Sequence, residues 1–162
     1  MRTLNGWDVA YYVVSIVLCA VTYLGLNRNI EWSLLPHKTV LEYWFGFRFV
    51  FVENVGYEQS HGLFIIAQNC LGVKLFISLF LILVLGFLHK YKATQDKIAA
   101  VVRFYFGALV LAFFATVVRI SVSVPFCTWD QFYLIHNTIS LVIYFAVGLV
   151  LYFVMERRLR AE

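Results

Sequence analysis

Four stretches of this 162-residue chain are each long and apolar enough to cross a membrane. A spanning helix needs about 20 mostly apolar residues. The stretches that meet this requirement are 9–26, 71–88, 98–124 and 136–154. The sequence therefore predicts an all-α multi-pass membrane protein in which about four transmembrane helices form one bundle.

The composition supports one membrane-embedded domain over residues 1–162. Hydrophobic residues make up 62% of the chain and charged residues 14%, whereas soluble domains are about half apolar and roughly a quarter charged. No linker, low-complexity tract or repeat of fixed period divides the sequence. The first apolar stretch does not look like a cleavable signal peptide, because the segment before it carries only one basic residue, Arg2, and no clear small-residue cleavage site follows. We therefore expect this stretch to remain as a membrane anchor.

The basic residues predict an orientation, because Lys and Arg collect in cytoplasmic loops. One side of the predicted bundle carries Arg2, Lys90, Lys92, Lys97, Arg157, Arg158 and Arg160, and the other carries Arg28, Lys38 and Arg48. Both termini are therefore expected in the cytoplasm, in a plasma (inner) membrane, with 27–70 and 125–135 outside. Arg103 is expected to extend toward the cytoplasmic interface. The basic blocks lie beside apolar spans, which indicates contact with membrane lipids and not with nucleic acid.

The outer segment 41–68 has two interpretations. Phe47, Phe49 and Phe51 alternate with other residues in the period of a strand, a turn signal follows at 54–56, and 63–67 is a candidate return strand. This pattern predicts a small hairpin. An interfacial aromatic helix through 41–51 is the alternative, because aromatic side chains also suit a membrane boundary.

Cysteine spacing gives no metal or cofactor signal. Cys19, Cys70 and Cys127 form no CxxC pair and no ligand spacing with the histidines. Cys70 opens the second predicted span, and Lys74 follows one turn later, where a cation can lower the pKa of a thiol. Cys19 has no ionisable neighbour and is expected to be structural.

Arg119 is an ionisable residue inside the third predicted span. At a rise of roughly 1.5 Å per residue it lies about 7 to 8 Å below the end of that helix. A charge at this depth usually faces the bundle interior and marks a functional site, although it can also extend toward the surface. Its fork of donors suits an oxyanion. Thr116, one turn inward, is expected to help hold it.

His136 opens the fourth predicted span at the same membrane face. Its near-neutral titration suits proton exchange with a thiol and a leaving amine. A nucleophile, a cation and a base on three helices at similar depth are the groups that acyl transfer requires. His61 is a substitute base, whereas His37 and His89 are expected to be non-catalytic.

The order of these motifs resembles the exosortase/archaeosortase family, and the short chain is most similar to its compact exosortase K branch. Cys70-Leu71-Gly72-Val73-Lys74 matches the family's Cys-x-Gly-x-Arg stretch except that Lys74 replaces Arg. The stretch from Thr116 to Ile120 matches its Asn-x-x-Arg-Ile stretch except that Thr116 replaces Asn. His136 matches the histidine that opens a later helix, and Ser140 stands where a glycine is common.

The resemblance implies a cysteine transpeptidase or protease that cleaves sorting signals at the extracytoplasmic face. Its partners would be exported proteins whose C-terminus holds a short motif, a transmembrane helix and a basic tail. Cys70 would form a thioester, Arg119 would stabilise the oxyanion and His136 would transfer the proton. Asn69, Lys74 and Thr116 would be supporting residues. The acceptor would be water or a group on a lipid or glycan.

Two other functional classes remain open from the sequence. In a membrane thiol-disulfide redox protein, Cys70 and Cys127 on the outer side would cycle between dithiol and disulfide. In a non-enzymatic membrane scaffold, the polar residues would only fix helix packing.

Overall fold

The computed structural model describes residues 6–60 and 62–161. This part of the chain forms the α-helices α1 (Gly6–Arg28), α2 (Ile30–Phe45), α3 (Val73–Phe87), α4 (Thr94–Ser123) and α5 (Phe132–Ala161). It also contains the short 3-10 helices η1 (Gln68–Leu71), η2 (Leu88–Lys90) and η3 (Val124–Phe126).

Within the part of the chain that the structure describes, four helical segments are long and apolar enough to cross a membrane, which confirms the predicted fold class. They are Val9–Arg28, Gln68–Lys90, Thr94–Phe126 and Phe132–Arg158. Each continues past the predicted span, because the helices extend through polar flanking residues that the apolar count left out. The last helix begins at Phe132, so His136 lies one turn inside it and does not open it as predicted.

Helix α2 was not predicted from the sequence. It contains Pro36 and several charged residues, so it has no long apolar run. Its buried residues Leu34, His37 and Leu41 recur every three or four positions, and the helix contacts β2, η1 and α4. It ends at Phe45, before Gly46 at φ 67°. The alternative of an interfacial helix through 41–51 is therefore wrong beyond Phe45, although residues 41–45 are helical.

A small antiparallel sheet follows α2, in the order β1 (Phe49–Val52), β2 (Gly56–Gln59) and β3 (Ile65–Ile66). Phe51 pairs with Tyr57, and Tyr57 pairs with Ile66 on its other side. The predicted hairpin is confirmed, but its return strand is β2 and not 63–67, which supplies only β3. The turn is tight because Asn54 and Gly56 both adopt positive φ, 63° and 125°.

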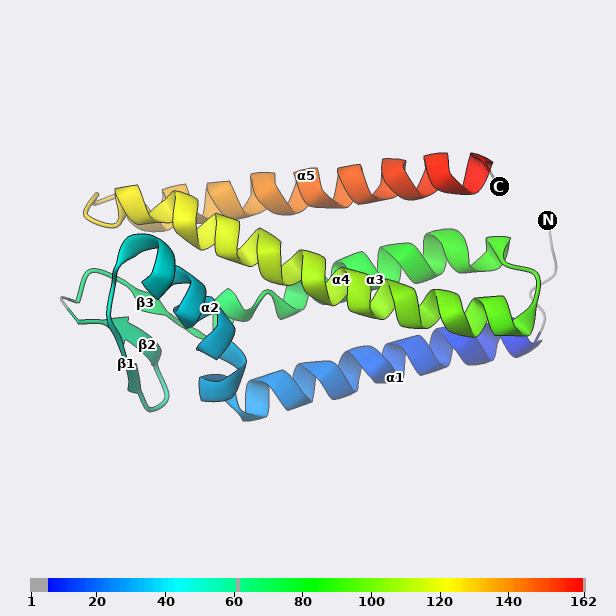
Figure 1. The fold of residues 1–162 in the computed structure, drawn as a ribbon, viewed down its shortest axis with the longest axis horizontal. Helices are drawn as coiled ribbons and strands as arrows, with labels where there is room; N and C mark the ends of the chain where they lie inside the picture. The colour runs from blue at the N-terminus through cyan, green and yellow to red at the C-terminus, as the bar shows by residue number, and fades with distance from the viewer. Residues whose placement is uncertain (1–5, 61, 162) are drawn as a thin grey trace.

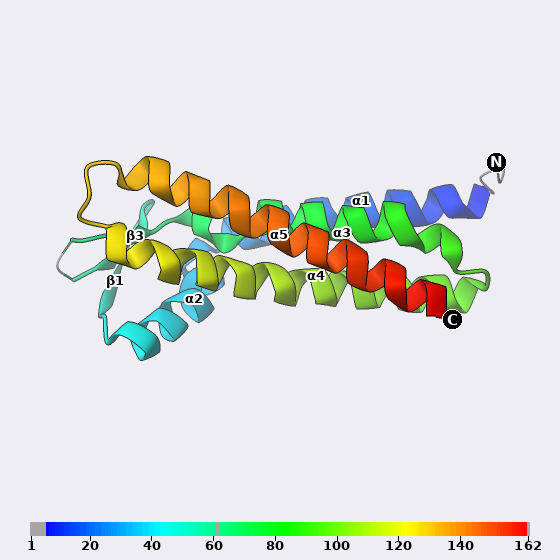
Figure 2. The same cartoon turned by 90° about the horizontal axis from the view of Figure 1, so that it is seen from above.

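The bundle is built around α3, which contacts α1, α4 and α5. Helix α2 and the sheet lie at one end, and the α3–α4 connection lies at the other (Figures 1 and 2). Helix α5 is the least enclosed of the long helices, because none of the residues in its most apolar window is buried.

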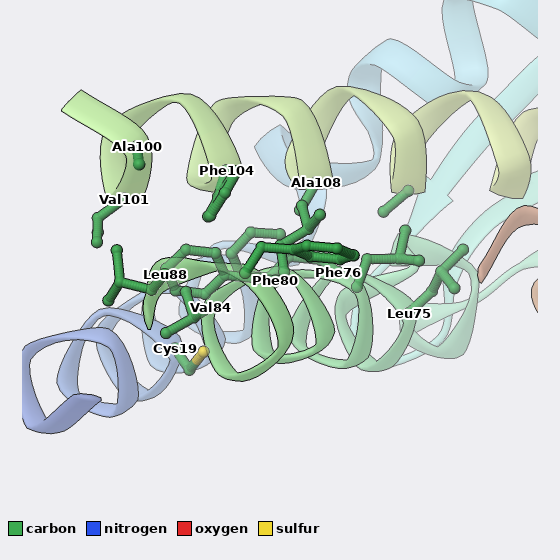
Figure 3. Packing of buried hydrophobic residues seen from close by; sticks show 14 of the residues in the cluster. Cys19, Leu75, Phe76, Phe80, Val84, Leu88, Ala100, Val101, Phe104 and Ala108 are labelled. Atoms are coloured by element: carbon green, nitrogen blue, oxygen red, sulfur yellow. The ribbon is translucent and has the colours of Figure 1, made fainter. Parts of the chain in front are cut away.

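The core between α3 and α4 combines aromatic with small side chains (Figure 3). On α3 the rings of Phe76 and Phe80 stack with centroids 5.9 Å apart, and Tyr105 of α4 meets both edge-on. Ala108 and Ala112 on α4 are buried, and such small residues allow helices to approach closely. The buried residues of α4 continue at the same spacing of three or four positions into the polar residues Thr116, Arg119 and Ser123.

Candidate active site

A cavity of about 670 Å³ is lined by residues from the end of the bundle that carries the sheet. Its lining comes from the end of α1, from β3 and η1, from the start of α3, the end of α4 and the start of α5. Cys70, Arg119 and His136 all line this cavity, as do Asn69 and Lys74. The residues that the sequence predicted as nucleophile, cation and base therefore share one cavity.

Cys70 is held against α4 by the turn between η1 and α3. Gly72 has φ 70°, and a Cβ at this position would lie 2.3 Å from Thr116 Oγ1 and 3.2 Å from the Ala112 carbonyl oxygen. Only glycine accepts both this backbone conformation and this contact without strain. The turn therefore brings the Cys70 backbone close to α4. The Cys70 side chain is buried, with 9% of its surface exposed.

Arg119 is 6% exposed and is held by groups from two other elements. Its Nη1 donates to Tyr144 Oη on α5 at 2.8 Å, and its Nη2 donates to the Asn69 carbonyl oxygen at 3.4 Å. The guanidinium carbon lies 5.5 Å from the centre of the Tyr144 ring. Because Asn69 precedes Cys70, these bonds fix the guanidinium beside the backbone of the cysteine.

The guanidinium keeps capacity for a ligand. Arginine has five N–H donors, and two of them make the bonds to Tyr144 and Asn69. Nε is buried and has no hydrogen-bond partner among the described residues. A developing negative charge in the cavity would therefore meet unused donors on a group that is already fixed in place.

His136 is joined to α4 through Ser123. Its Nδ1 lies 3.0 Å from Ser123 Oγ, and Ser123 Oγ donates to the Arg119 carbonyl oxygen at 2.8 Å. The His136 ring also lies 5.6 Å from the ring of Phe132, and its backbone carbonyl accepts a hydrogen bond from Ser140 Oγ. A continuous polar network thus connects the imidazole on α5 to the residue that carries the guanidinium.

The three predicted supporting residues contact the site in different ways, and only the expectation that Thr116 holds Arg119 is wrong. Asn69 contacts Arg119 through its backbone oxygen. Lys74 lines the cavity with an exposed side chain. Thr116 Oγ1 makes no hydrogen bond to Arg119 or to any other described residue, and instead lies against Gly72. Tyr144 holds the guanidinium in its place.

Tyr144 and Ser123 are the site residues that the sequence analysis missed. Tyr144 follows His136 by eight residues and Ser123 follows Arg119 by four, so each lies on the same helical face as a predicted site residue. That spacing was the available signal. Serine and tyrosine are common enough in such helices that the spacing alone did not distinguish them.

The other thiols and imidazoles fall in different places. Cys127 lines the same cavity as Cys70, whereas Cys19 packs in the core between the helices. His89 belongs to η2, and His61 lies outside the described residues. No group of three or more His, Cys, Asp or Glu side chains that could hold a metal ion occurs within 6–60 and 62–161.

His37 lines a second cavity of about 430 Å³, together with mostly apolar residues. It is 3% exposed, and its ring meets Phe113 edge-on with centroids 4.8 Å apart. Burial, assisted by the positive charge of Arg119, lowers the pKa of His37 to about 4. Its imidazole is therefore neutral near pH 7.

Comparison of the chain with protein-family models, with curated proteins and with solved structures finds no match. Function is therefore inferred from the geometry and chemistry of the cavity itself.

Proposed function

We propose that this protein is an exosortase-like membrane cysteine peptidase or transpeptidase. The observation that carries this proposal is the shared cavity of Cys70, Arg119 and His136, which come from three separate parts of the chain. A thiol, a guanidinium with unused donors and an imidazole are the groups that acyl transfer through a thioester requires.

In the proposed reaction, Cys70 Sγ forms a bond to the scissile carbonyl carbon, and the carbonyl oxygen becomes an oxyanion that Arg119 stabilises. The thiol proton passes through His136 to the leaving amine as the carbon–nitrogen bond breaks. An acceptor then attacks the thioester carbonyl carbon and loses its proton to His136. The carbon–sulfur bond breaks, and Cys70 Sγ leaves and takes that proton back from His136. Water as acceptor gives proteolysis, and an amine or hydroxyl on a lipid or glycan gives transfer.

The distribution of basic residues supports an extracytoplasmic active site. Lys90 and Lys92 adjoin the α3–α4 connection, at the end of the bundle opposite the cavity (Figure 1). Arg157 and Arg158 lie at the far end of α5 from His136. If this basic end is cytoplasmic, both termini lie on the cytoplasmic side of a plasma membrane, and the cavity opens on the extracytoplasmic side.

The substrates we propose are exported proteins that end in a short motif, a transmembrane helix and a basic tail. The test expresses such candidates beside the protein and follows their size by immunoblotting. Cys70→Ala should abolish processing, while Cys19→Ala, which removes a thiol outside the cavity, should leave it intact. Arg119→Lys should also abolish it, because an ammonium cannot reproduce the guanidinium fork. Full processing by Cys70→Ala would refute the proposal.

The position of Cys127 favours one alternative, a thiol-disulfide redox protein. Cys70 and Cys127 line the same cavity and both thiols are free. This alternative requires both cysteines, and it predicts a mobility shift on non-reducing gels. An active Cys127→Ser protein would exclude it, because a peptidase needs only Cys70.

A further inference from the structure

The hydroxyl of Ser123 contacts a carbonyl oxygen, which can only accept a hydrogen bond, and an imidazole nitrogen, which can donate or accept one. Its Oγ lies 2.8 Å from the Arg119 carbonyl oxygen and 3.0 Å from His136 Nδ1. A serine hydroxyl has a single hydrogen, and a carbonyl oxygen can only accept. The hydrogen must therefore point to Arg119, because two oxygen lone pairs would otherwise face each other at 2.8 Å. The Ser123 lone pairs are left for His136.

An acceptor opposite Nδ1 requires a hydrogen on Nδ1. A neutral imidazole has one N–H, so Nε2 then carries the lone pair. We propose that Ser123 is a positioning residue that fixes His136 as the Nδ1–H tautomer and leaves Nε2 as the proton acceptor. The tautomer follows from the hydrogen bonds alone, and its catalytic use rests on the proposed function.

Burial strengthens this assignment. Ser123 is 2% exposed, so water does not readily replace its bonds. It ends α4, and its acceptor is the backbone of Arg119, so its hydroxyl is fixed by the same helix that carries the guanidinium. Nε2 has no hydrogen bond to any described residue. Among the described residues, the ring is therefore hydrogen-bonded only through Nδ1, and Nε2 is left to contact a substrate.

The cavity lining explains why a neutral partner takes this role. Among the described residues that line the cavity there is no Asp or Glu, although a carboxylate commonly orients a catalytic histidine. A serine fixes the tautomer without placing a negative charge beside Arg119. The guanidinium is thus left without an anionic competitor for an oxyanion.

The test is long-range ¹H–¹⁵N NMR of the full chain in micelles with ¹⁵N-labelled histidine, at a pH where the imidazoles are neutral. A His136→Asn variant identifies the signals of His136. The wild-type spectrum should show the Nδ1–H pattern. Ser123→Ala should lose that pattern, Ser123→Thr should keep it because the hydroxyl remains, and the control Ser121→Ala should keep it because Ser121 Oγ has no partner among the described residues.

A wild-type spectrum with hydrogen on Nε2 would overturn the inference, and this holds even if Ser123→Ala fails to fold. An unchanged spectrum in a folded Ser123→Ala protein would overturn it as well. In the processing assay, Ser123→Ala should be slower by about fivefold, the value of one typical hydrogen bond, and Ser123→Thr should restore the rate. Processing that survives Cys70→Ala would refute the function and leave the tautomer result unchanged.

Discussion

Replacing Gly72 with alanine should destabilise the protein and displace Cys70. Gly72 joins η1 to α3 at φ 70°, and a new Cβ would meet Thr116 Oγ1 at 2.3 Å and the Ala112 carbonyl oxygen at 3.2 Å. Real Cβ atoms do not tolerate the first of these contacts. Either Thr116 or the turn that carries Cys70 must therefore move.

Two costs contribute to the expected loss. An L-residue in the left-handed region costs roughly 1 to 2 kcal/mol. Forcing an extra methyl group into a packed site costs typically about 1 to 3 kcal/mol. We therefore expect Gly72→Ala to lower the free energy of unfolding by about 2 to 5 kcal/mol.

The clash and the backbone strain can be separated by a second substitution. Thr116→Ala removes the oxygen that the new Cβ would meet at 2.3 Å, but it leaves φ and the Ala112 carbonyl unchanged. Combined with Gly72→Ala, it should recover about 1 to 3 kcal/mol as a coupling energy. The residual loss then measures the left-handed conformation and the remaining 3.2 Å contact.

The assay is unfolding in mixed micelles of increasing SDS content, followed by circular dichroism, together with the rate at which a maleimide labels Cys70. Gly86→Ala is the matched control, because Gly86 lies within α3 with nothing within 4 Å of its Cβ position. The reasoning is refuted if Gly72→Ala is as stable as Gly86→Ala, or if Thr116→Ala does not relieve it.

Two further predictions concern Tyr144 and His37. Tyr144→Phe keeps the ring but removes the acceptor of Arg119 Nη1. Because hydrogen bonds to charged groups contribute about 1.5 to 3 kcal/mol, processing by this variant should fall about ten- to a hundredfold. The control variant Tyr152→Phe should process substrates normally. Lowering the pH from 7.5 to 5 should destabilise the protein by about 2 kcal/mol through His37, because its folded pKa of about 4 lies below the ordinary 6.5 and the unfolded chain takes up the proton first. This stability is present above pH 6.5 and is lost as the pH falls toward 4; an equal pH dependence in His37→Gln would contradict the assignment.

Much of the architecture could be predicted, because a spanning helix has a strong sequence signal. Length and apolar content identified the four long helices, and their order predicted that Cys70, Arg119 and His136 share one end of the bundle. Helix α2 gave no such signal. It is stabilised by packing against β2, η1 and α4, and it contains Pro36, so tertiary contacts outweigh its local sequence.

The connections inside the site were less predictable than its members. Thr116 was expected to hold Arg119 because it lies one turn away, but its hydroxyl lies against Gly72. The bond from Arg119 to Tyr144 joins α4 to α5, and the distance between two helices is set by packing that no single segment encodes. Ser123 was missed for the same reason.

One face of α4 carries both the small residues that pack against α3 and the polar residues of the site. Ala108 and Ala112 fit against α3 on the same face that carries Arg119 and Ser123. Each residue turns an α-helix by about 100°. Adding or deleting one residue between Ala112 and Arg119 would therefore swing the guanidinium away from Tyr144 even with every side chain retained. The site therefore depends on the angular position of each reactive side chain around the α4 axis as much as on the residue type.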